Sequence, residues 1–171
     1  MRKLILSLCL LCSVAAAADA PTGLDRLPSV LPGIWQTDGQ TQDSPVSKAG
    51  PQHYTTRRDC WREPEAYRCV SVVNGTLQLY DTFTWDAAAR VYHQTRITPQ
   101  GAQPAFTVAV TGDTWSYQQD FTRNDGSTVH LRIVRTYGPA GTASYDESFS
   151  PDVKQWLEVA KGTDTRVDAG K

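Results

Sequence analysis

The sequence predicts an all-β domain, an antiparallel up-and-down meander of about eight to ten strands closed into a barrel. Between residues 70 and 149, short segments alternate apolar and polar side chains, which is typical of strands with one buried face. Turn residues separate these segments by only a few positions, so consecutive strands are expected to pair. A meander of this length avoids exposed edges by closing on itself, and a two-sheet sandwich is the alternative.

The first 18 residues are expected to be a secretory signal peptide. Arg2 and Lys3 precede an apolar run over residues 4–14, and alanines follow up to the expected cleavage site after Ala18. The mature protein would then begin at Asp19 and reside in the periplasm or outside the cell.

The mature chain is expected to form one domain, with a barrel over residues 33–167 and a flexible tail over residues 168–171. Without Arg2 and Lys3, the formal net charge changes from −1 to −3. The rest of the chain has no basic run, which argues against nucleic acid and anionic membrane as partners. It also has no apolar run of transmembrane length. The oligomeric state is left open.

Residues 19–32 are expected to form a short helix that covers one end of the core. Leu24, Leu27 and Leu31 are spaced so that one or two helical turns bring them together. Trp35 then lies at the start of the first strand. Residues 38–52 are polar and lack periodicity, which predicts a long loop that is a lid, a binding loop or a disordered segment.

Two cysteines remain after removal of the signal peptide, Cys60 and Cys69, and they bracket the turn between strands expected at residues 53–61 and 67–73. In an oxidising compartment this pattern predicts a disulfide. Closing a loop of about ten residues should stabilise the fold by roughly 2.5–3 kcal/mol. A metal site is not expected, because two thiols at this spacing are too few ligands for zinc.

Asn74-Gly75 is a strong signal for a two-residue hairpin. A regular hairpin pairs Val73 with Thr76 and, further along, Arg68 with Asp81. Asp81 lies on an otherwise apolar face, so Arg68 and Asp81 are expected to form a structural ion pair.

Gly112-Asp113 predicts a second tight hairpin. This turn pairs Val110 with Trp115 and Val108 with Tyr117, so the large side chains share one face. The same alternation predicts further strands at residues 76–85, 91–98, 105–111, 114–121, 128–137, 142–150 and 155–167.

Gly33-x-Trp35 near the start and Arg166 near the end resemble the lipocalin or calycin architecture, in which a first-strand Trp packs near a last-strand Arg. Over residues 33–167 the chain is also similar to secreted bacterial lipocalin-like families of unknown function. Those families usually have Asp-Gly before the last Trp, whereas this chain has Asp152-Val153. The resemblance implies a barrel and, at most, a small-molecule cavity. The matching residues are Trp85-Asp86 with Tyr92, Gly112-Asp113-x-Trp115, Asp125-Gly126, and Glu147-Ser148-x-Ser150-x-Asp152 followed by Trp156.

Common catalytic motifs, such as a nucleophile elbow, a zinc-protease helix or a phosphate-binding loop, are absent from the sequence. His53, His93 and His130 are far apart, which favours solvated or singly hydrogen-bonded histidines over a metal site. No cofactor is implied, and an enzyme is the less favoured interpretation.

Arg135 and Glu147 are the candidate functional residues, because both carry charge on otherwise apolar faces of adjacent strands. Buried charges are costly unless paired, so the two are expected to share the interior, as a salt bridge or as a ligand site. The hypothesis is that Arg135 anchors the acidic head of a small amphiphile and Glu147 orients Arg135. Tyr137, Tyr145 and Trp115 would form the wall.

The favoured function is therefore binding of a small hydrophobic or amphiphilic molecule. One alternative follows from the resemblance, because some calycin barrels are lyases or isomerases that use Arg, Tyr and Glu inside the cavity. The other is a protein-interaction module of the cell envelope that uses residues 38–52 as its contact loop.

Overall fold

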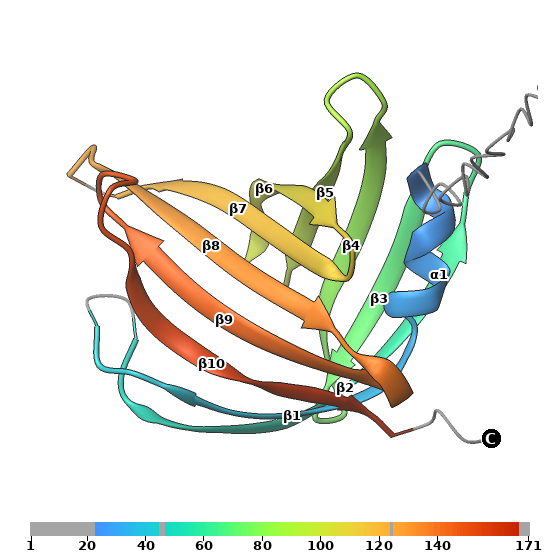
Figure 1. Cartoon of the computed structure of the whole chain (residues 1–171), viewed down its shortest axis with the longest axis horizontal. Coiled ribbons are helices and arrows are strands. Elements are labelled where there is room, and N and C mark those ends of the chain that lie inside the picture. Colours follow the sequence, from blue (N-terminus) through green and yellow to red (C-terminus); the bar gives the residue numbers. More distant parts are fainter. Residues whose placement is uncertain (1–22, 45–46, 124, 168–171) are drawn as a thin grey trace, which may run out of the picture.

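The computed structural model describes residues 23–44, 47–123 and 125–167, and these form a closed antiparallel barrel (Figure 1). The predicted meander is confirmed, because each strand pairs with its neighbours in sequence and β1 pairs with β10. The predicted signal peptide (residues 1–18) and tail (residues 168–171) lie outside the described residues. The strands are β1 (Gly33–Thr41), β2 (Gly50–Arg62), β3 (Tyr67–Val73), β4 (Thr76–Asp86), β5 (Val91–Thr98), β6 (Gly101–Thr111), β7 (Thr114–Thr122), β8 (Thr128–Tyr137), β9 (Thr142–Ser150) and β10 (Leu157–Arg166).

The loop predicted at residues 38–52 is shorter than expected. Strand β1 continues to Thr41 and β2 begins at Gly50, and these two residues are the last of the β1–β2 pairs. The connection therefore covers residues 42–49. The ends of both strands carry mostly polar side chains, so they lack the alternation of apolar residues that predicts a strand.

The first and last strands close the barrel. Trp35 is the Cα partner of Arg166, and the Arg166 guanidinium carbon lies 5.8 Å from the centroid of the Trp35 ring. Two residues further along β1, the Thr37 hydroxyl donates a hydrogen bond of 2.6 Å to its cross-strand partner Asp164.

The lead-in segment covers one end of the barrel, as the leucine spacing predicted. It consists of a 3₁₀ turn (Gly23–Arg26) and α1 (Leu27–Val30), and Figure 1 shows it alongside β2 and β3. Leu24, Leu27 and Leu31 are buried in the main core with aromatic side chains from the barrel. Arg26 binds the tight β6–β7 turn through Asp113 at 3.1 Å. These contacts fill one end of the barrel, and the opposite end is the one at which β1, β7 and β9 finish.

Cys60 and Cys69 form the predicted disulfide. The two residues are Cα partners on β2 and β3, and Cys69 is buried in the core. The bond therefore fastens two strands that already pair.

The Asn74-Gly75 hairpin forms, but its register changes after a few residues. Val73 pairs with Thr76 as predicted, whereas Ser71 pairs with Leu79 because β4 has one extra residue at this point. Such a β-bulge shifts every later pair by one position and thereby exchanges the faces of the strand. Arg68 consequently pairs with Thr82, and Asp81 pairs with Cys69.

Val153 lies at a turn, in the left-handed region with a φ of 59°. The Asp152 carboxylate stabilises this turn by accepting hydrogen bonds from the backbone N–H groups of Lys154 and Gln155, at 2.9 and 3.1 Å. A β-branched residue in this conformation is strained, typically by about 1–2 kcal/mol.

We predict that Val153→Gly raises the free energy of unfolding by about 0.5–1 kcal/mol, because relief of strain outweighs the added freedom of the unfolded chain. Denaturant unfolding checks this value. The matched control is Val70→Gly in β3, where the change should destabilise the protein. Equal destabilisation by the two changes would show that Val153 is unstrained.

Candidate ligand-binding site

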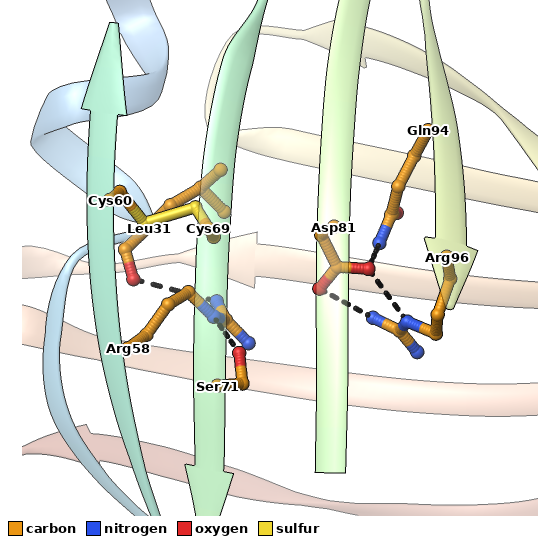
Figure 2. Close-up of a disulfide and its surroundings, with 8 residues drawn as sticks. All are labelled: Leu31, Arg58, Cys60, Cys69, Ser71, Asp81, Gln94 and Arg96. Atoms are coloured by element: carbon orange, nitrogen blue, oxygen red, sulfur yellow. Dashed lines mark hydrogen bonds and ion pairs between the residues drawn. A yellow bond between two sulfur atoms is a disulfide. The ribbon is translucent and has the colours of Figure 1, made fainter. Parts of the chain in front are cut away.

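Asp81 lies inside the barrel, 3 % exposed, and forms an ion pair with Arg96 of β5 (Figure 2). Arg96 donates from Nε at 2.7 Å and from Nη2 at 3.2 Å, one bond to each carboxylate oxygen. Gln94 donates a third hydrogen bond at 2.8 Å. The predicted partner of Asp81 was therefore wrong. The bulge in β4 turns Asp81 inward, whereas Arg68 lies on the outer face of β3 and pairs there with Glu63 at 2.8 Å.

Arg135 forms the second interior ion pair, with Asp164 of β10. Its Nη2 lies 3.1 Å from Asp164 Oδ2, and Thr37 holds the other oxygen of the same carboxylate. The hypothesis that Glu147 orients Arg135 is thus corrected, because Asp164 does so. Burial alone would lower the pKa of Arg135, but the neighbouring Tyr137 and Asp164 raise it above its ordinary value, so Arg135 stays cationic.

Arg58 of β2 is a third interior guanidinium, and the sequence did not single it out. Its Nε donates to the Ser71 hydroxyl at 3.3 Å, and its Nη1 donates to the Leu31 carbonyl at 3.5 Å (Figure 2). Among the described residues, no carboxylate forms an ion pair with Arg58. Its positive charge is therefore not compensated by a direct partner in the part of the chain that the structure describes.

These three arginines line one cavity of about 100 Å³, which we call the inner cavity. Asp81 in the lining compensates Arg96, and Asp164 behind the lining compensates Arg135, so the walls keep the positive charge of Arg58. The volume is below the roughly 300–1,000 Å³ of pockets for whole small molecules, and it suits a head group or a small anion. The lining residues are Leu31, Arg58, Asp81, Phe83, Gln94, Arg96, Phe106, Tyr117, Ile133 and Arg135.

A second cavity, the outer pocket, has a volume of about 460 Å³, which is within the range for whole small molecules. It lies toward the end that the lead-in helix leaves uncovered, and most of its walls are apolar. Along β8, Val129 and Leu131 line the outer pocket, and Ile133 and Arg135 line the inner cavity, so the two spaces follow one another through the barrel. The lining residues of the outer pocket are Thr41, Ser47, Gln52, Phe121, Arg123, Val129, Leu131, Glu147, Phe149, Val159 and Ala160.

Glu147 lies in the outer pocket, where its cross-strand neighbours are Ile133 and Ala160. The Glu147 side chain makes no hydrogen bond or ion pair with another side chain or backbone group in the described segments. Burial raises the pKa of Glu147, and the positive charge of Arg135 opposes this shift only in part. Glu147 is therefore a partly buried carboxyl group without a direct side-chain partner among these residues.

Tyr145 is the cross-strand partner of Arg135, whose guanidinium carbon lies 5.8 Å from the centroid of the tyrosine ring. The Tyr145 hydroxyl donates to Gln52 and occupies a niche left by two glycines. A Cβ atom on Gly39 would lie 2.4 Å from this hydroxyl, and one on Gly162 would lie 2.8 Å from it. Burial raises the pKa of Tyr145 to about 12, so its hydroxyl is neutral.

Trp115 and Tyr137 were predicted to line the ligand site, but they lie in neither cavity. Trp115 is 0 % exposed, and its ring stacks on Tyr92 with a centroid distance of 5.6 Å. Tyr137 packs edge-on against Trp115 at 5.7 Å. These rings belong to the core at the end of the barrel that the lead-in helix covers. Trp115 is buried in the same cluster as Leu24, Leu27 and Leu31, and Tyr137 packs against it.

The three histidines each lie beside one aspartate, namely Asp38 for His53, Asp86 for His93 and Asp120 for His130. In residues 23–44, 47–123 and 125–167, no group of three His, Cys, Asp or Glu side chains is placed to hold a metal ion. Over the same ranges, no helix is long and apolar enough to span a membrane.

The fold and the site together define a closed antiparallel barrel with two successive internal cavities, one cationic and one largely apolar. Among solved structures, Rv2717c from M. tuberculosis matches with a TM-score of 0.48 and 18 % sequence identity over 82 % of this chain and 95 % of that one. No protein-family model matches the chain. No curated protein matches it either.

We predict that Asp81→Ala and Arg96→Met each lower the free energy of unfolding by about 3 kcal/mol, because each leaves a charge without its partner inside the barrel. Arg68→Met should cost less than about 1 kcal/mol, as expected for an exposed pair. Urea unfolding measures all three. If Arg68→Met lowered the free energy of unfolding as much as Arg96→Met does, Arg68 would be the partner of Asp81, as the sequence predicted.

The raised pKa of Glu147 predicts a pH-dependent cost. A carboxyl group whose pKa is higher in the folded state destabilises the fold as pH rises through its unfolded pKa, and the full cost is reached above the folded pKa. Glu147→Gln removes this cost. Its stability relative to wild type should therefore be greater at about pH 7 than at about pH 4. Unfolding curves of both proteins at both pH values test this. An equal difference in the free energy of unfolding at the two pH values would mean that burial does not raise the pKa of Glu147.

Proposed function

We propose that this protein binds a small amphiphilic molecule with an acidic head. The head enters the inner cavity, and the apolar part occupies the outer pocket. The observation that carries the proposal is the charge of the inner cavity, where two carboxylates compensate two of the three guanidinium groups and leave that of Arg58 uncompensated.

The partners of the three arginines indicate which of them receive the head. Arg96 is engaged with both oxygens of Asp81, so it is the least free to bind an anion. Arg58 makes only long hydrogen bonds to neutral oxygens, of 3.3 and 3.5 Å. Arg135 uses one nitrogen for Asp164, and 24 % of its side chain is exposed although it lies deep in the barrel. Because Arg135 lines the inner cavity, this exposed surface supports contact with a bound head group.

The volumes support the division of the ligand between the two spaces. A cavity of about 100 Å³ admits a carboxylate or a similar oxyanion but no long chain. The outer pocket, with a volume of about 460 Å³, is lined by Phe121, Leu131 and Phe149, which favour an apolar tail. The disulfide and the N-terminal sequence support a location in an oxidising compartment, the periplasm or the cell exterior.

Calorimetric titration with dodecanoate, below the concentration at which it forms micelles, tests the proposal. Wild-type protein should bind dodecanoate and should bind uncharged dodecanol more weakly. Arg58→Met and Arg135→Met should each weaken dodecanoate binding about tenfold or more, since each removes a charged hydrogen-bond donor.

Arg57→Met is the matched control, because Arg57 lies next to Arg58 on the outer face and pairs there with Asp59 at 3.0 Å. It should bind dodecanoate as wild type does. Arg135→Met leaves Asp164 without its cation and can unfold the barrel, whereas Arg58 has no carboxylate partner among the described residues. Unchanged dodecanoate binding in a folded Arg58→Met variant would overturn the proposed site.

A further inference from the structure

Glu147 is a charged group that the proposed head-and-tail arrangement does not use. It lines the outer pocket beside Val159 and Phe149, and its Cα partners Ile133 and Ala160 offer it no polar atom. A carboxylate removed from water without a hydrogen-bond donor is costly, and an alkyl chain placed over it would remove still more water. A plain fatty acid therefore complements this pocket less well than a ligand that donates hydrogen bonds to Glu147.

From these contacts we infer that the ligand also carries a protonated amine, which Glu147 binds. This inference rests on the function proposed above and narrows its ligand class to zwitterionic amphiphiles. An ammonium group donates charge-assisted hydrogen bonds to a carboxylate, so it compensates Glu147 in a way that hydrocarbon does not. The specificity-determining residue of the outer pocket is thus Glu147.

The register of β8 and β9 indicates where the amine lies along the ligand. Arg135 pairs with Tyr145, and Ile133 pairs with Glu147, so Arg135 and Glu147 are diagonal neighbours on the inner face. Such neighbours are about 7–8 Å apart at the backbone, and both side chains reach into the interior. The amine consequently lies within a few bonds of the acid, and the apolar tail follows it toward Phe121 and Phe149.

Arg123 is the other charged residue of the outer pocket, and it would favour an anion there instead. Arg123 is exposed and lies just beyond the end of β7, whereas Glu147 is largely buried in the middle of β9. An interaction at the desolvated position is stronger than one at the solvated position. Glu147 therefore dominates the selection.

The experiment compares dodecanoate, 2-aminododecanoate and 2-hydroxydodecanoate by calorimetric titration. Wild-type protein should bind the amino acid about tenfold or more tightly than dodecanoate, as one charge-assisted hydrogen bond predicts. The hydroxy acid should fall between them. Glu147→Gln should bind dodecanoate at least as well as wild type and should lose most of the preference for the amine.

Asp146→Asn is the matched control, because Asp146 precedes Glu147 on the same strand and faces solvent. It removes the same charge from the protein and should keep the full preference. Equal affinity of wild-type protein for dodecanoate and 2-aminododecanoate would overturn this inference and leave the proposed function standing. Preserved amine preference in Glu147→Gln would overturn the role of this residue. Failure to bind any of the three probes would reject the proposed function together with this inference.

Discussion

Pairing of charges inside a closed barrel is the constraint on which this structure depends. Asp81 with Arg96 joins β4 to β5, and Asp164 with Arg135 links β10 to β8. A shift of any of these strands by one residue would turn its charge outward and leave the partner buried alone. The two pairs therefore help to specify the register of strands whose alternation of apolar residues is weak.

The architecture could be predicted because turns and alternation are local signals. The turn at Gly112 predicted the register of β6 and β7, in which Val110 pairs with Trp115. The spacing of Cys60 and Cys69, together with an oxidising compartment, predicted their disulfide. The burial of Leu24, Leu27 and Leu31 followed from helical spacing. These features depend on residues close in sequence, where one chain contains the information needed.

The site was less accessible to prediction, because its contacts depend on register and on polar interior positions. One extra residue in β4 separated Asp81 from Arg68, and the turn at Asn74 carries no sign of a bulge further along. Strand β5 has polar residues on both faces, so the alternation did not identify Arg96 as an inward residue. Arg58 and Asp164 were missed for the same reason. A barrel with a polar interior lacks the contrast between faces on which such predictions rely.

The hydrogen bond between Thr37 and Asp164 joins residues 127 positions apart, across the seam between β1 and β10. Contacts of such long range carry the largest loop-closure entropy and correspond to slow folding. The β8–β9–β10 meander brings the Asp164 carboxylate to Arg135, but the Thr37 hydroxyl that orients this carboxylate arrives only when β1 pairs with β10. Folding kinetics and site assembly are therefore coupled. A chain that has formed every hairpin but not the seam has most of its sheet and still lacks the geometry of the inner cavity.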